Sequence, residues 1–121
     1  QVVYRSADGH LHEIGWAGAA PASAWDVVGA AGAPPAAADP ACWFVPANGT
    51  KHISYAGVDG HVHDLAWPAG TATPTWTDLT LSALAPPAAA EHVTGWVEPG
   101  SATCRVAFRG TDGHLHEIGW G

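Results

Sequence analysis

The sequence predicts an all-β protein, a β-propeller built from four-stranded blades, and two observations support this. Residues 8–16, with the sequence DGHLHEIGW, recur almost unchanged at residues 59–67 and 112–120. The aromatic residues that precede the three copies, Tyr4, Tyr55 and Phe108, are 51 and 53 residues apart. A repeat of about this length suits a propeller blade of four strands. The chain is therefore expected to be a repeat protein.

Each copy of the motif, together with the residues before it, predicts a β-hairpin. Large apolar residues alternate with smaller or polar ones before the motif, which is the period of a strand. An Asp-Gly pair then predicts a tight two-residue turn with positive φ. In the returning strand, the two histidines and the tryptophan of the motif would share one face, and the acidic residue would lie on the other.

The complete middle unit predicts four strands, at residues 41–45, 51–57, 61–67 and 75–81. Residues 33–40 and 83–90 are connections rich in alanine and proline. A Pro-Pro pair excludes a ladder strand and favours extended chain. We expect each connection to be a stiff crossing from the outer edge of one blade to the centre of the next, rather than a flexible linker.

The register divides a single repeat domain, residues 1–121, into an incomplete blade at 1–30, a blade at 41–82 and an incomplete blade at 91–121. These would carry three, four and three strands. Two to three blades do not close a ring and would leave sheet faces and edges exposed. We expect oligomerisation to complete the ring, or the chain to be a piece of a longer protein.

Composition excludes several classes of function. The net charge of -7, with only 4 Lys and Arg, argues against binding to nucleic acid or an anionic membrane. No apolar run approaches the roughly 20 residues that a membrane span needs. The first residue is Gln1 rather than Met, which suggests a mature or trimmed product.

The two cysteines, Cys42 and Cys104, stand at non-equivalent places in the repeat. A disulfide between them is one interpretation, if the compartment is oxidising. Two buried free thiols are the alternative. Two cysteines alone do not make a structural zinc site.

Aromatic and acidic residues at repeated positions indicate sugar binding. A tryptophan face can stack on a sugar ring or pack one blade on the next, and a carboxylate can accept paired hydrogen bonds from adjacent hydroxyls or from the protein itself. Two arginines at one repeat position could donate to a ligand or brace the turn. These candidates are Trp16, Trp25, Trp67, Trp76, Trp120, Glu13, Asp64, Glu117, Arg5 and Arg109.

Each copy of the motif also contains a His-X-His pair, whose rings would share a face of the strand. Such a pair could chelate a metal ion, although no third ligand is evident on that face. Packing, or hydrogen bonding to sugar by a neutral imidazole, is favoured. The first histidines, His10, His61 and His114, are further candidates for sugar binding.

No pattern of catalytic residues occurs in the chain, and an active site usually occurs once, whereas a binding site can be repeated. We expect a protein that is not an enzyme and that has no catalytic residue, no metal and no cofactor.

The segments YRSADGHLHEIGW and FRGTDGHLHEIGW resemble the blades of bacterial propeller lectins of the Photorhabdus lectin type. More distantly they resemble the fucose-binding propeller lectins of fungi and Ralstonia. In the fucose lectins the sugar lies between adjacent blades, held by an Arg and a Glu of one blade and by aromatic residues of the next.

The resemblance implies three pairings across the gaps between blades. Glu13 would face Trp67 and Trp76, Asp64 would face Trp120, and Glu117 would face Trp16 and Trp25 of a neighbouring chain. The arginine of the fucose lectins has no counterpart at the matching positions, which hold Val2, Ile53 and Val106.

These arguments together predict a multivalent lectin that is secreted or extracellular. Its partners would be the ends of glycans and further copies of the chain, with no nucleic acid and no membrane span. Individual sites would be weak, and repetition would raise avidity by about 10²–10⁴. The alternatives are a structural or protein-binding propeller assembly, a metal-binding protein that uses the His-X-His pairs, and an accessory carbohydrate-binding piece of a secreted hydrolase.

Overall fold

A computed structural model describes residues 2–68, 71 and 73–121 of the chain as three antiparallel sheets with two short helices. The first sheet contains β1 (Val2–Arg5), β2 (Leu11–Gly15) and β3 (Ser23–Asp26), followed by α1 (Val27–Ala31). The second contains β4 (Ala41–Val45), β5 (Thr50–Ala56), β6 (Val62–Pro68) and β7 (Thr75–Asp78), followed by α2 (Leu79–Ala83). The third contains β8 (Thr94–Val97), β9 (Cys104–Arg109) and β10 (Leu115–Trp120).

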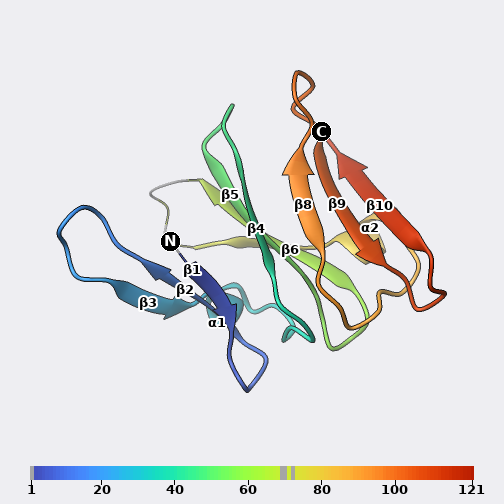
Figure 1. Cartoon of the computed structure of the whole chain (residues 1–121), viewed down its shortest axis with the longest axis horizontal. Helices are drawn as coiled ribbons and strands as arrows, with labels where there is room; N and C mark the ends of the chain where they lie inside the picture. The colour runs from blue at the N-terminus through green and yellow to red at the C-terminus, as the bar shows by residue number, and fades with distance from the viewer. Residues whose placement is uncertain (1, 69–70, 72) are drawn as a thin grey trace.

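The strands of each sheet are paired in chain order, as three, four and three strands. The expected division of strands is thus confirmed for the part of the chain that the structure describes. The second sheet lies between the first and the third (Figure 1). The strand orders form no closed sheet within the described residues.

The hairpin loops differ from the expected two-residue turn. The amide of Ser6 donates to the carbonyl of His10, so three residues form the loop. In this loop Gly9 has a φ of 85°. Asp8 is not among the residues with positive φ. A two-residue turn of type I′ needs positive φ at both central residues, whereas a three-residue loop needs it only at the glycine.

The fourth strand of the middle unit is shorter than expected. β7 ends at Asp78, whose carboxylate accepts a hydrogen bond of 3.0 Å from the amide of Leu81 and so caps α2. Asp26 caps α1 in the same way through the amide of Gly29, at 2.8 Å. Both helices have five residues, too few to show a helical period in the sequence.

Each gap between neighbouring sheets contains one hydrophobic core. The first core joins Leu11 and Val27 of the first sheet and its helix to Ile53, Tyr55 and Trp67 of the second sheet. The second core has the same construction one repeat later, and its members are Ala56, Val62, Leu79, Ala88, Val93, Val106, Phe108 and Ile118. The second sheet therefore packs against the first sheet with one face and against the third sheet with the other.

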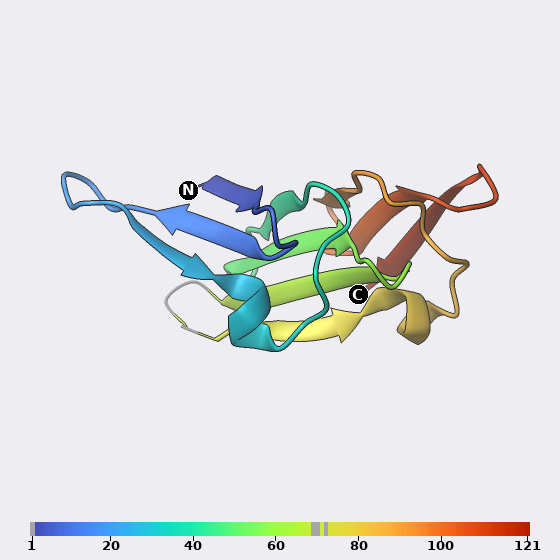
Figure 2. The same ribbon diagram turned by 90° about the horizontal axis from the view of Figure 1, so that it is seen from below.

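The connections run past the neighbouring sheets (Figure 2), and hydrogen bonds hold them against these sheets. The amide of Ala36 donates to the carbonyl of Gly9 at 2.7 Å, and the amide of Ala37 donates to the carbonyl of Ala56 at 2.8 Å. The amide of Ala88 donates in the same way to Gly60, at 2.8 Å. Backbone hydrogen bonds thus hold each connection in place, and the connections fix the position of one sheet relative to the next.

The two cysteines are free, so the disulfide hypothesis is wrong. Cys104 is buried but Cys42 is exposed, so the alternative of two buried thiols holds for one of them. None of the helices in the described residues is long and apolar enough to cross a membrane.

Candidate binding site between the second and third sheets

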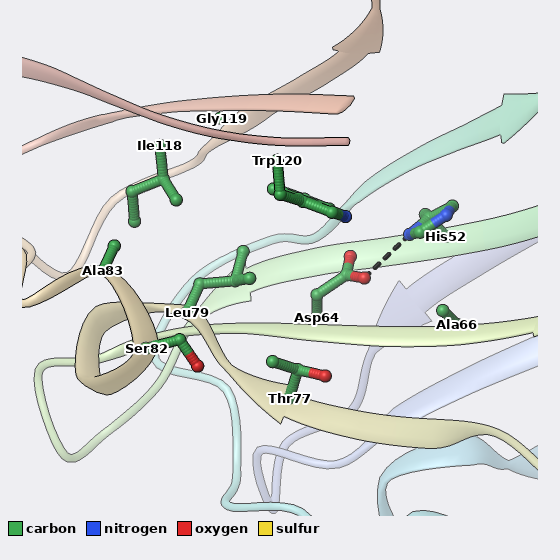
Figure 3. A pocket seen from close by; sticks show the side chains of 10 residues that line it. All are labelled: His52, Asp64, Ala66, Thr77, Leu79, Ser82, Ala83, Ile118, Gly119 and Trp120. Carbon is green, nitrogen blue, oxygen red and sulfur yellow. Dashed lines mark hydrogen bonds and ion pairs between the residues drawn. The ribbon is translucent and has the colours of Figure 1, made fainter. Parts of the chain in front are cut away.

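A pocket of about 380 Å³ lies between the second and third sheets (Figure 3). The second sheet contributes His52, Asp64 and Thr77, and α2 contributes Leu79 and Ser82. The opposite wall is β10, which contributes Trp120. Elements far apart in the sequence meet here because the second core holds the two sheets face to face.

Asp64 lies at the base of this pocket and is only 3% exposed. Its carboxylate accepts a hydrogen bond of 2.7 Å from the hydroxyl of Ser54, which stands directly opposite on β5. The other oxygen lies 2.7 Å from Nδ1 of His52. Burial raises the pKa of the Asp64 carboxyl above its ordinary value, although the two hydrogen bonds act in the opposite direction.

Aromatic rings fix the position of these polar groups. The ring of Trp43 stacks on His52 with a centroid distance of 4.0 Å, and its indole nitrogen donates to the hydroxyl of Ser54 at 3.0 Å. Trp120 meets Trp43 edge to face at 5.9 Å. A side chain on Gly95 would come within 2.3 Å of Trp43. The close approach of β8 to this tryptophan therefore requires glycine.

The open side of the pocket carries the hydroxyl groups of Thr77 and Ser82, which are both exposed. The pocket thus combines an indole ring, buried Leu79, a buried carboxylate and two hydroxyls. A few fixed polar groups on a mostly apolar wall are the usual composition of a site for a small ligand. Asp64 and Trp120 were predicted to face each other, and the structure places both in this pocket.

The corresponding gap between the first and second sheets is arranged differently. The indole nitrogen of Trp25 donates to the carboxylate of Glu13 at 3.1 Å, and Lys51 lies 3.9 Å from the same oxygen. Trp25 also meets Trp67 edge to face at 5.8 Å. Lys51 lies 5.8 Å from the centroid of the Trp67 ring. Glu13 is thus bonded to Trp25 of its own sheet.

Trp25 and Trp76 are not equivalent in the structure, although both were predicted to stand at repeated positions. Trp25 stands opposite Glu13 in the strand register, whereas Trp76 stands opposite Leu65. They therefore lie on opposite faces of their sheets. Trp76 donates to Nδ1 of His63 at 3.0 Å. Trp25 is turned into its own chain, so it does not face the Glu117 of a neighbouring chain as expected.

Glu117 lies on the outward face of the third sheet, where it pairs with an arginine that the sequence analysis missed. Nη1 of Arg105 lies 2.9 Å from Glu117, and Nη2 lies 3.2 Å from Glu98. The position that matches the lectin arginine is Val106, as the sequence shows, and Arg105 is its neighbour. Arg105 precedes Val106 by one residue, and strand alternation puts it on the face of Glu117.

Arg5 and Arg109 lie away from the pocket, at the ends of β1 and β9. Nη1 of Arg109 is 2.6 Å from Glu91, and Nε of Arg5 is 3.9 Å from Asp39. All four side chains are substantially exposed, and such pairs contribute little to stability. Each arginine thus pairs with an acidic side chain outside its turn, and these pairs do not brace the turn.

The first histidines of two of the His-X-His pairs bond the aspartates that cap the helices. Nδ1 of His10 lies 2.5 Å from Asp26, and Nδ1 of His61 lies 2.6 Å from Asp78. These hydrogen bonds raise the pKa of both histidines above the ordinary value. His114, in the third sheet, donates its backbone amide to Asp112 at 2.9 Å.

The second histidines lie against the aromatic residue of the preceding strand, stacked in the first and third units and tilted in the second. The rings of Tyr4 and His12, Tyr55 and His63, and Phe108 and His116 are 5.5, 5.4 and 5.5 Å apart. His63 and His116 also contact the aspartate of their own turn, at 3.0 and 3.1 Å. In the second sheet the two rings of the pair therefore bond different carboxylates, His61 that of Asp78 and His63 that of Asp59.

Asp59, His61 and Asp78 offer three ligand atoms within 4.8 Å of one another. His61 therefore has two further metal ligands nearby, which are Asp59 of the turn and Asp78 of β7. All three side chains are already used: Asp59 bonds His63, and Asp78 bonds both His61 and the start of α2. In the described residues this cluster links the turn, β6 and the start of α2 by hydrogen bonds.

Trp16 is 54% exposed on the outward face of the first sheet, whereas its equivalent in the second sheet, Trp67, is buried. The sequence analysis placed both in one class of ligand-binding residue. The polar and apolar residues of the pocket that were not predicted include His52, Thr77, Leu79 and Ser82. The sequence does contain a signal that the first and second units differ at this point. The spacing from the second histidine to the capping aspartate is 14 residues from His12 to Asp26 and 15 from His63 to Asp78.

No family model and no curated protein matches the chain. A solved structure of a fucose lectin from Kordia zhangzhouensis, in complex with methyl-fucoside, matches with a TM-score of 0.61 and 19% sequence identity. The match covers 98% of this chain and 81% of that chain. At this identity the likeness concerns the fold, so the chain has an all-β fold like that of a fucose lectin. The resemblance to Photorhabdus lectins stays a prediction.

Proposed function

We propose that the protein is a lectin without catalytic activity, and that the pocket between the second and third sheets binds a sugar. The observation that carries the proposal is the placement of Trp120 beside the buried carboxylate of Asp64, in a pocket with two exposed hydroxyls. The structural neighbour is a lectin solved with methyl-fucoside, which supports a sugar as the ligand class.

The chemistry of the pocket suits a ring that has one apolar face and several hydroxyls. The apolar face would lie against the indole of Trp120, and aromatic contacts of this kind contribute about 0.5–1.5 kcal/mol. Ser54 and His52 use two of the roughly four acceptor positions on the Asp64 carboxylate, so hydroxyls of the sugar can donate to the others. Thr77 and Ser82 can donate or accept at the rim.

Preorganisation lowers the cost of binding at this pocket. Asp64 is held by Ser54, and Ser54 is held by Trp43, so these side chains lose little freedom when a ligand enters. A shallow pocket for one sugar still gives a weak site. Repetition of sites would supply the avidity of a multivalent lectin.

The proposal includes a propeller whose blades are the three sheets, completed by further copies of the chain outside the cell. The outward face of the first sheet carries Val2, Tyr4 and Trp16, which are 49, 42 and 54% exposed. Their equivalents in the second sheet are buried against a neighbouring sheet. In such a ring, Trp16 of one copy would approach the Glu117–Arg105 pair of the next.

Calorimetric titration with methyl-fucoside and a panel of other methyl glycosides, with and without EDTA, tests the proposed function. The wild type should bind at least one sugar, and EDTA should leave the affinity unchanged. Trp120→Ala should weaken binding by about threefold to tenfold, the loss of one aromatic contact. Ser82→Ala should weaken binding without any change in folding, because this hydroxyl lies at the exposed rim.

Trp76→Phe is the matched control, because Trp76 lies outside the pocket on the opposite face of its sheet. It should bind sugar like the wild type. Wild-type protein that binds no sugar in the panel, or equal binding by all the variants, would contradict the proposal. Binding that disappears in EDTA would replace it with a metal-dependent function.

A further inference from the structure

The two gaps between the sheets hold different residues at the same position of the repeat. Trp25 stands opposite Glu13, and Thr77 stands opposite Asp64. The residue that follows each is the aspartate that caps the helix, so the two positions match in register and in their relation to α1 and α2. The extra residue before Asp78 moves the tryptophan of the second sheet, Trp76, to the opposite face.

In the first gap, Trp25 makes the two kinds of contact that the second gap offers to a ligand. Its indole nitrogen donates to the carboxylate of Glu13 at 3.1 Å, as a ligand hydroxyl would donate to Asp64. Its ring lies edge to face with Trp67 at 5.8 Å, and Trp67 is the repeat equivalent of Trp120. The side chain also packs against the first hydrophobic core.

The walls of the two gaps otherwise correspond. Leu79 at the base of the second pocket matches Val27, and both belong to the hydrophobic cores. Lys51 beside Glu13 is replaced by Cys104 in the second gap, which removes a cation from that wall. The threonine side chain at position 77 is much smaller than an indole, and the pocket of about 380 Å³ lies beside it.

We propose that the two gaps are a closed and an open form of one binding site. The side chain of Trp25 fills the first gap, and the smaller side chain of Thr77 leaves the second gap open. The identity of the ligand as a sugar rests on the proposed function, whereas the closing and opening of the gaps do not. The residue at this position thus sets how many sites of one chain can bind.

Two substitutions at the matched positions test the inference. Thr77→Trp should place an indole within hydrogen-bond distance of Asp64 and close the second gap. Trp25→Thr should remove the occupant and open a cavity beside Glu13 in the first gap. Trp76→Phe is the control, because it changes a neighbouring aromatic residue that does not line the second pocket.

The first measurement is the crystal structure of each variant without ligand, which does not depend on sugar binding. The inference expects an indole beside Asp64 in Thr77→Trp and a new cavity beside Glu13 in Trp25→Thr. An unchanged open pocket in Thr77→Trp, or a first gap that collapses completely in Trp25→Thr, would overturn it. Trp76→Phe should keep the second pocket as it is.

The second measurement is the stoichiometry of sugar binding by calorimetry, with the sugar that the wild type binds. Thr77→Trp should lower the affinity of the second gap by at least a hundredfold, and Trp25→Thr should add about one site per chain. If the wild type binds and Thr77→Trp binds equally well, the inference fails while the proposed function stands. If the wild type binds no sugar, the proposed function fails and the structures alone decide the inference.

Discussion

The residue that faces the second histidine of each motif determines how that histidine reaches the aspartate of its turn. In the second unit this residue is Gly57, and Nε2 of His63 contacts Asp59 directly at 3.0 Å. In the first unit it is Ser6, whose hydroxyl lies 3.1 Å from Nε2 of His12 and bonds Asp8. The serine hydroxyl therefore takes the place of a direct contact between histidine and carboxylate.

Substitution of Gly57 tests this role. A side chain on Gly57 would come within 2.5 Å of Asp59 and 2.8 Å of His63. Because His63 is fully buried, Gly57→Ala should destabilise the fold by about 1–3 kcal/mol, as overpacking does. Gly57→Ser should cost less, since its hydroxyl can bridge the histidine and the aspartate as Ser6 does. Urea denaturation measures both, and equal losses would contradict the bridging role.

The pair of His61 and Asp78 predicts a defined pH dependence. The hydrogen bond that His61 donates to Asp78 raises the pKa of His61, although partial burial opposes it. A histidine whose pKa is raised on folding stabilises the fold fully below its ordinary pKa, and this contribution is lost as the pH rises through the folded value. The stability that Asp78 supplies through His61 should therefore be larger at about pH 5.5 than at about pH 9.

Asp78→Asn isolates the charge in this pair, because asparagine also caps helices well. NMR titration should show the pKa of His61 returning to the ordinary value in this variant, while His10, whose partner is Asp26, stays raised. Thermal unfolding should show a difference from the wild type that shrinks as the pH rises. A difference that grows with pH would contradict the assignment.

At the scale of elements, the connections hold the sheets in place. Tyr55 on β5 donates its hydroxyl to the carbonyl of Pro34 at 2.7 Å, which fixes the start of the connection between the first and second sheets. Burial raises the pKa of this phenol, so it stays a donor over the whole ordinary pH range. The side chain is fully buried.

Tyr55→Phe should therefore destabilise the fold by about 1–3 kcal/mol, because it leaves the carbonyl of Pro34 without this donor. Tyr4→Phe is the matched control, since Tyr4 holds the same repeat position but is 42% exposed. Its effect should stay within about 0.5 kcal/mol. Urea denaturation compares the two, and equal effects would show that the bond to Pro34 contributes nothing.

The elements also show how far the sequence predicts this fold. The repeat period and the Asp-Gly signals located all three hairpins, and the Pro-Pro pairs located the connections. The helices were missed because five residues carry no visible period, so residues 79–81 were assigned to a strand. Trp25 was placed on the wrong face because the two units differ by one residue before the capping aspartate, and a shift of one residue reverses every side chain of a strand.

At the scale of the whole molecule, the outer sheets present faces whose equivalents are buried within the chain. Trp16 is 54% exposed on the first sheet, and Leu115 is 83% exposed on the third. A head-to-tail contact between copies would bring these two faces together and bury Trp16 as Trp67 is buried. This arrangement is the proposed route to a closed ring.

Trp16→Ser should then lower the mass of the assembly in light scattering, without loss of the circular-dichroism spectrum of the folded chain. The expected direction follows from the loss of a large apolar contact between copies. Trp67→Ser, at the equivalent buried position, should instead unfold the chain. A wild-type protein that is already a monomer, or an assembly whose mass does not change in Trp16→Ser, would contradict the ring.

The backbone hydrogen bonds between the connections and the sheets need no particular side chain. The amides of Ala36 and Ala37 bond the carbonyls of Gly9 and Ala56, and no side chain that lines the pocket takes part. These bonds therefore do not depend on which polar side chains stand in the gap. Mutation can alter the chemistry of one gap while the scaffold and the other gap stay as they are. A lineage of such chains could thus diversify its ligands one gap at a time, with each repeat evolving under its own selection.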